Sequence, residues 1–289
     1  MSQKSALTWL VPLIVLLAVI TAGTGLFFPG GGEPFTFTTV HGQIVEMYGR
    51  GIYKNDSLLA GAGFRGTDAI TLLVAIPFLL IAYASARRGS QNGMILLIGS
   101  LFFFLYNGAS LNFSAAFNPL FLAYTALFSV SLYATLIALV RFNLQSLVAR
   151  VKQGFPRRGI AIFLFITGIG TLFIWMSDIL PALISGIAPA TLGPYTSMYT
   201  HGFDSAVITP AAVLIGIFLL QQKPLGYLFS APILILCALI GIVVIGQTAS
   251  QALAGLFFPP GVYIGMIGSW VLMGAFAVGL TISYFRHLA

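Results

Sequence analysis

Eight long apolar runs, separated by short segments that carry most of the charge, make up this 289-residue sequence. A helix needs about 20 apolar residues to cross the hydrocarbon core of a bilayer, so eight crossings with their loops use nearly the whole chain. Charged residues contribute only 7% of the sequence, whereas a soluble domain carries roughly a quarter. The sequence therefore predicts an all-α polytopic membrane protein, a single integral domain over residues 1–289 surrounded by lipid bilayer.

The ends of the helices are predicted from the proline, glycine and charged residues that interrupt the apolar runs. The predicted helices lie near residues 8–28, 69–86, 93–109, 117–140, 159–180, 205–221, 225–247 and 261–284. The first run is longer than the roughly 7 to 15 residues of a signal-peptide core, which favours a retained helix. For the third and fourth runs, a broken helix with a re-entrant segment is the alternative to two full spans.

The basic residues predict which ends of these helices face the cytoplasm. Ten of them fall on one set of alternating ends: Lys4, Arg87, Arg88, Arg141, Arg150, Lys152, Arg157, Arg158, Lys223 and Arg286. The opposite set has only Arg50, Lys54 and Arg65. By the positive-inside rule, both termini are cytoplasmic and the chain lies in the cytoplasmic (inner) membrane. Because the net charge of +7 is divided among short tracts, it does not indicate a nucleic-acid partner.

All six acidic residues fall on the opposite, outer side, together with two of the three histidines. An outward-facing site for a small polar or ionic ligand is the leading interpretation. Its predicted binding residues are Glu46, Arg50, Arg65, Asp68, Asp178, His201 and Asp204.

Three of these carboxylates also have structural interpretations. Asp68 and Asp204 lie at predicted helix starts, where a carboxylate accepts backbone N–H bonds and faces the positive end of the helix dipole. Asp178 lies among apolar residues near the outer end of its helix. An ionisable group at that depth is a functional candidate, and the alternative is a solvated helix end.

Two further features concern organisation. The loop at 29–67 mixes aromatic and charged residues, which predicts a folded outer cap and a surface for a partner in a membrane complex. The tetrapeptides Arg65-Gly-Thr-Asp68 and His201-Gly-Phe-Asp204 lie 136 residues apart. They suggest two parallel four-helix repeats, 1–150 and 151–289, with accidental recurrence as the alternative.

The sequence does not identify a cofactor, and no metal-binding motif is present, because His41 and His201 lack the spacing of a ligand pair. Three functions stay open. The first is binding or transport of a small polar or ionic ligand. The second is an enzyme for a lipid-linked or quinone-like substrate at the outer leaflet, with a carboxylate or His201 as general base and Arg50 or Arg65 holding an anionic group. The third is a structural subunit of a membrane complex.

Overall fold

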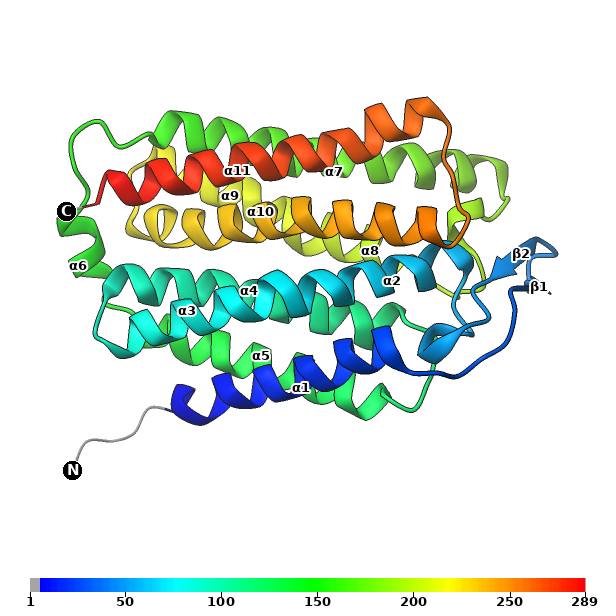
Figure 1. Cartoon of the computed structure of the whole chain (residues 1–289). Helices are drawn as coiled ribbons and strands as arrows, with labels where there is room; N and C mark the ends of the chain where they lie inside the picture. Colours follow the sequence, from blue (N-terminus) through cyan, green and yellow to red (C-terminus); the bar gives the residue numbers. More distant parts are fainter. Residues whose placement is uncertain (1–5, 289) are drawn as a thin grey trace.

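The computed structural model describes residues 6–288, and its helices run side by side as one elongated bundle (Figure 1). Within these residues, eight helical spans are long and apolar enough to cross a membrane. This confirms the prediction of an all-α polytopic membrane protein. The third and fourth runs are separate helices, so the broken-helix alternative does not apply.

Several of the spans are built from more than one segment. The first four spans are α1 (Leu7–Phe27), α2 with α3 (Leu58–Ile70 and Ile76–Arg87), α4 (Gln91–Ser114) and α5 (Phe121–Val140). After the short α6 (Leu144–Ala149) come α7 (Arg157–Ser185), α8 with α9 (Tyr199–Phe203 and Thr209–Leu220), α10 (Pro224–Leu253) and α11 (Gly268–Arg286). The π-helical turns Thr71–Ala75, Asp204–Ile208 and Val262–Ile267 continue the second, sixth and eighth spans.

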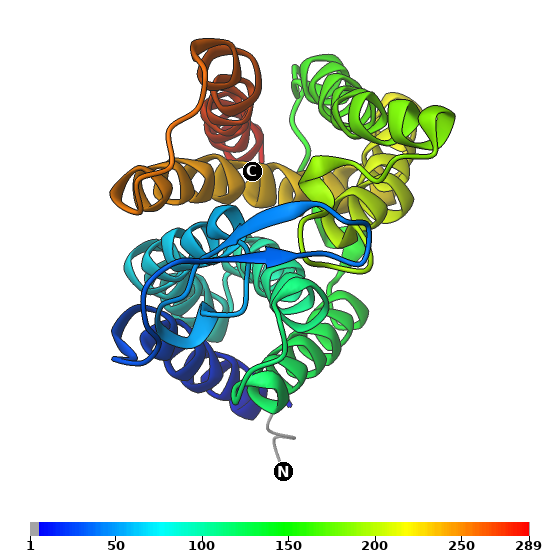
Figure 2. The same ribbon diagram turned by 90° about the vertical axis from the view of Figure 1, so that its right-hand side faces the viewer.

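Two helices form the centre of the bundle. About two thirds of α4 and of α10 is buried inside the protein, against a third or less for the other spans. Helix α4 packs against α3, α5 and α10, and α10 also packs against α2, α9 and α11. Viewed from the end, α10 separates the first four spans from α7 and α11 (Figure 2). The lipid-facing helices thus surround a central pair.

The two ends of the bundle differ in charge and structure. Nine of the ten predicted cytoplasmic basic residues lie at one end of the bundle. They belong to the end of α3 and the turn after it, the turns after α5 and α9, the segment from the end of α6 to the start of α7, and the end of α11. Lys4 lies outside the described residues. At the opposite end, β1 (Phe35–Thr38) and β2 (Ile44–Met47) form an antiparallel hairpin in which Phe35 faces Met47. The loop after α1 is therefore folded.

The second span begins earlier than predicted, at Leu58 rather than near 69. Ser57 caps it by accepting a hydrogen bond from the Ala60 amide at 3.2 Å. The segment resembled a loop because of its glycines. Gly66, however, lies directly against α10, and Gln247 of α10 donates to Thr67 at 2.9 Å. The end of the predicted 29–67 loop is therefore helical, and tertiary packing compensates for the low helix propensity of glycine.

This contact gives a prediction about stability. A Cβ at Gly66 would lie 2.3 Å from the Gly246 carbonyl oxygen, and neither backbone can move without separating α2 from α10. We expect Gly66→Ala to lower the free energy of unfolding by about 1–3 kcal/mol, measured by thermal unfolding in detergent. Gly170→Ala in α7 is the control, because a Cβ there has open space around it. Equal melting temperatures for the two variants would contradict the close approach.

Asp68 and Asp204 are not helix caps, which corrects the structural interpretation of both. Asp68 lies eleven residues after the Ser57 cap, and Asp204 lies within the sixth span, which begins at Tyr199. Each is at or near a π-helical turn that precedes a proline, Pro77 or Pro210. Proline lacks an N–H and clashes with the carbonyl four residues earlier, which a wider turn accommodates. The eighth span has a π-helical turn without a following proline.

Candidate ligand site at the outer ends of α7 and α8

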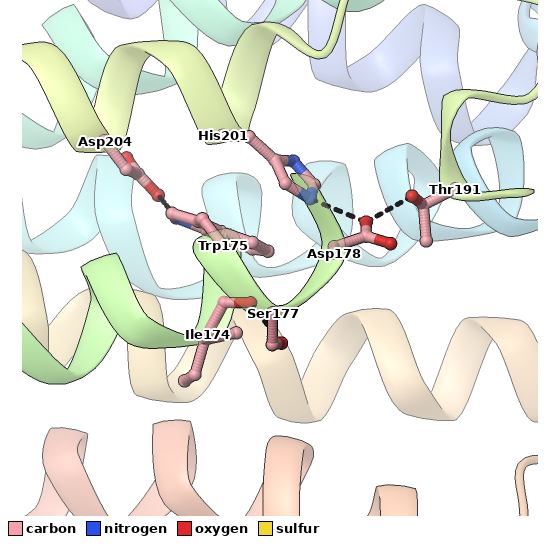
Figure 3. Close-up of polar contacts among 7 residues, drawn as sticks. All are labelled: Ile174, Trp175, Ser177, Asp178, Thr191, His201 and Asp204. Carbon is pink, nitrogen blue, oxygen red and sulfur yellow. Dashed lines mark hydrogen bonds and ion pairs between the residues drawn. The ribbon is translucent and has the colours of Figure 1, made fainter. Parts of the chain in front are cut away.

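Asp178 and His201 come together near the hairpin end of the bundle, in the second half of the chain (Figure 3). Asp178 lies on α7, about two turns before its end, and His201 lies on the short α8. The His201 Nε2 atom is 3.1 Å from Asp178 Oδ2, and the Thr191 hydroxyl donates to the same oxygen. The imidazole is 14% exposed and the carboxylate 30%. Both groups are therefore partly exposed at the surface of the protein.

Trp175 forms the inner wall of this arrangement. It lies one turn before Asp178 on α7, and its ring centroid is 4.1 Å from that of His201. The indole N–H donates to Asp204 Oδ2 at 3.1 Å. On its other side, Trp175 faces Trp270 of the eighth span, with 6.2 Å between ring centroids. The indole therefore connects the exposed His201–Asp178 pair to a deeper carboxylate.

Asp204 is the deeper carboxylate, and it is 3% exposed. Besides the indole, the Tyr106 hydroxyl of α4 donates to its Oδ1 at 3.1 Å. Both oxygens are thus occupied by neutral donors from two different helices. Polar groups buried in a membrane protein are expected to be paired in this way, because unpaired ones are costly in hydrocarbon.

The carboxylates of this site are not neutralised by a lysine or arginine from the described part of the chain. Among residues 6–288, neither Asp178 nor Asp204 forms an ion pair with a lysine or arginine. The hydrogen bonds of Asp178 all use Oδ2, so its Oδ1 is left to accept from a ligand. The Trp175 ring packs against His201, and aromatic faces attract cations. The arrangement favours a ligand that carries positive charge or donates hydrogen bonds.

The other predicted binding residues lie elsewhere at the hairpin end of the bundle. Arg65 donates to the Tyr48 hydroxyl at 3.2 Å and to the Leu26 carbonyl at 3.1 Å. Asp68 is buried in the first half of the chain, where it accepts a bond of 2.8 Å from the Tyr53 hydroxyl.

Two more of them belong to the outer cap. Arg50 pairs with the exposed Glu33 at 2.8 Å, and Glu46 is exposed on β2. The structure therefore joins Asp178, His201 and Asp204 into one cluster and leaves four predicted residues outside it.

Asp56 is a polar group of the cap that the sequence interpretation did not select. It is completely buried, and its Oδ1 accepts from the Ala116 amide and from the Tyr195 hydroxyl, each at 2.8 Å. Burial raises the pKa of Asp56 to about 6, and these two hydrogen bonds limit the rise. Burial and the neighbouring Asp56 also raise the pKa of Tyr195. Asp56 thus ties together three outer loops that are distant in sequence.

Thr191 and Trp175 are the contributors to the ligand site that the sequence interpretation missed. Trp175 had a usable signal, because residues three apart on a helix share a face, and Asp178 is three residues later. Thr191 had none, since it lies in a loop that folds back onto α7. Comparisons with protein-family models, with curated proteins and with solved structures found no match.

Proposed function

We propose that this multi-pass membrane protein binds a small ligand, positively charged or rich in hydrogen-bond donors, at its outer end, as a transporter or a binding component in the cytoplasmic membrane. One observation supports this most directly. Asp178, partly exposed and held by His201 and Thr191, lies beside an aromatic wall with a second carboxylate behind it. The basic residues at the far end of the bundle favour an outward-facing site under the positive-inside rule.

The bonding arrangement explains how such a ligand would be held. An ammonium group would donate to the open Oδ1 of Asp178, with His201 beside it and the buried Trp175 behind His201. His201 offers a second polar contact whose role depends on its protonation. Asp204 would contribute its charge from behind the indole without touching the ligand. Low surrounding polarity strengthens each of these interactions relative to water.

The proposal predicts that organic cations stabilise the protein through Asp178. We expect at least one of tetramethylammonium, ethanolammonium and guanidinium chloride to raise the melting temperature above that in sodium chloride of equal ionic strength. A ligand at about 100 times its Kd stabilises by about 2.7 kcal/mol. Asp178→Asn removes the charge and keeps one acceptor oxygen, so the shift should largely disappear.

Glu46→Gln serves as the matched control, because Glu46 is exposed on the hairpin and distant from Asp178 in the sequence. It should retain the full cation-dependent shift. An equal shift in Asp178→Asn would place the cation elsewhere, and the absence of any shift in the wild type would count against a cationic ligand.

A membrane-embedded enzyme is the second candidate, favoured by the pairing of His201 with a carboxylate. A carboxylate that holds an imidazole is the arrangement of a general base. The version that uses Arg50 or Arg65 to hold an anionic group has less support, because Arg50 pairs with Glu33 and Arg65 bonds Tyr48. Turnover of a lipid-linked or quinone-like substrate by protein in lipid, lost in His201→Gln, would favour this candidate.

A structural subunit is the third candidate, favoured by the apolar surface of the outer hairpin. Phe35, Phe37, Val40 and Ile44 are all at least 45% exposed although they lie outside the spans. Exposed apolar patches commonly mark protein contacts. Retention of a partner in detergent, lost when these four residues are made polar, would support this role.

A further inference from the structure

Asp68 is a second buried carboxylate, and it belongs to the first half of the chain, away from the ligand site. It is 1% exposed, and the α1 backbone packs so closely that a Cβ at Gly25 would lie 1.8 Å from Asp68 Oδ2. No basic side chain among residues 6–288 forms an ion pair with it. An ionisable group within a span and without a charged partner is a functional candidate, because its charge is costly there.

The groups that face Asp68 are mostly neutral. Arg65, one turn earlier, is the cation within electrostatic reach, but its guanidinium bonds Tyr48 and the Leu26 carbonyl. Three neighbours interact with Asp68: Arg65 of α2 itself, Tyr53 of the turn Gly51–Tyr53, and Tyr124 of α5. The amides that α10 contributes on this side are engaged elsewhere, because Gln247 bonds Thr67 and Gln251 bonds the Leu59 carbonyl. From α1, the backbone at Gly25 packs against it. Tyrosine hydroxyls are therefore the groups that exchange a hydrogen bond or proton with this carboxylate.

Tyr124 lies between Asp68 and the buried Asp56 of the cap. Its hydroxyl is near the side chains of Tyr53 and Asn118 and within electrostatic reach of both carboxylates. The hydroxyl is buried and forms no hydrogen bond of good geometry, although Tyr53 and Asn118 are close enough to interact with it, and Oδ2 of Asp56 is also buried without a partner. Buried polar atoms are nearly always paired. An unpaired donor and an unpaired acceptor in one cluster are the groups that a bridging water or a transferred proton would use.

A small cavity lies beside this cluster, in the cap. It has a volume of about 160 Å³, enough for several water molecules. Exposed Lys54, Asn55 and Phe117 line it, together with the buried Asn118 that lies near Tyr124. Asn55 immediately precedes Asp56. Water in the cavity therefore has a short route to the cluster.

We propose that Asp68 takes up and releases a proton through the outer cap, by way of Asp56, Tyr124 and Tyr53. In uptake, the Tyr53 hydroxyl proton passes to Asp68 Oδ2, Tyr124 replaces it, and Asp56 or a bridging water replaces the Tyr124 proton. One proton leaves the outer water and one carboxylate becomes a carboxylic acid, with no change of oxidation state. This inference goes beyond the ligand site and does not depend on it.

The pKa values of Tyr53 and Asp56 suit these roles. The pKa of Tyr53 is raised well above its usual value, mainly by burial and to a smaller extent by the charge of Asp68 and by the nearby Tyr124. The hydroxyl therefore stays protonated and passes on a proton only as it receives another. Asp56, with its pKa raised by burial to about 6, can both accept and donate near neutral pH.

Infrared spectroscopy of the protein in lipid tests the proposal, because the C=O stretch of a protonated carboxyl shifts when its hydrogen is replaced by deuterium. We expect a carboxyl band that is absent in Asp68→Asn and that loses intensity as pH is raised across the range in which the protein stays folded. After transfer to D₂O, the band should shift about tenfold or more slowly in Tyr53→Phe and in Tyr124→Phe. Tyr133→Phe, an exposed position on the same helix as Tyr124, is the matched control and should exchange at the wild-type rate.

Three results would overturn the proposal. The first is the absence of an Asp68 band throughout this pH range, which means a permanently ionised group. The second is a band that does not change with pH, which means a permanently protonated one. The third is wild-type exchange in both tyrosine variants, which excludes the path. Melting temperatures show whether each variant is folded, and a poorly folded Asp68→Asn can be replaced by isotope labelling of aspartate in the wild type.

Discussion

Replacement of Asp204 by alanine is expected to destabilise the protein strongly, whereas replacement by asparagine is not. Alanine leaves the Trp175 N–H and the Tyr106 hydroxyl without their acceptor. An unpaired buried polar group costs about 1–3 kcal/mol, and two are affected. Asparagine can accept from the indole through Oδ1 and donate from its amide to the Tyr106 oxygen, since a hydroxyl both donates and accepts. Unfolding by denaturant in detergent measures both variants.

The same pair of variants separates the structural role of Asp204 from its electrostatic role. Asp204→Asn should fold like the wild type but show a smaller stabilisation by organic cations, because the negative charge behind Trp175 is gone. Trp175→Phe, which removes the indole donor and keeps an aromatic face, should have a smaller effect on stability than Asp204→Ala. If alanine and asparagine at 204 gave equal stability, the bonds to Trp175 and Tyr106 would not contribute as described.

The helical architecture is predictable from the sequence because the bilayer leaves few alternatives. A chain in hydrocarbon must satisfy its backbone hydrogen bonds internally, so each long apolar run becomes a helix. The starts of helices are less predictable. In α2, Gly61, Gly63 and Gly66 resemble a loop locally, and only the close approach of Tyr48 at Gly61 and of α10 at Gly63 and Gly66 makes them favourable there. Such a contact between distant segments has no local signal.

The sequence predicts which types of residue form the candidate site, but it does not predict which of these residues lie together. Asp178, His201 and Asp204 stood out as ionisable residues of the predicted outer side, but so did Asp68, which lies in the other half of the chain. Their separation depends on how the loop between α7 and α8 folds, since it brings Thr191 back onto Asp178. The paired tetrapeptides before Asp68 and Asp204 gave no guide to partners, because one carboxylate bonds Tyr53 and the other bonds Trp175 and Tyr106. The repeat hypothesis stays a prediction.

Because burial raises the pKa of Asp56, we expect the free energy of unfolding of the wild type to fall as pH rises to about 6. Its pKa in the folded protein is about 6, raised by burial from the ordinary 3.8, so the folded state holds this proton more tightly than the unfolded chain. Between these two values protonation favours folding, and above the higher one the protein contains an ionised buried carboxylate. A shift of this size corresponds to a loss of about 3 kcal/mol.

The contribution of Asp56 appears as a difference between variants, because other groups titrate in the same range. Asp56→Asn keeps the oxygen that accepts from Ala116 and Tyr195, and it cannot ionise. Its free energy of unfolding should therefore vary less between about pH 4 and pH 7.5 than that of the wild type, and it should be the more stable protein at the upper end. Glu46→Gln, at an exposed position, should follow the wild-type curve. Parallel curves for wild type and Asp56→Asn would show that Asp56 ionises at no cost, which is incompatible with a fully buried carboxylate that has one oxygen unpaired.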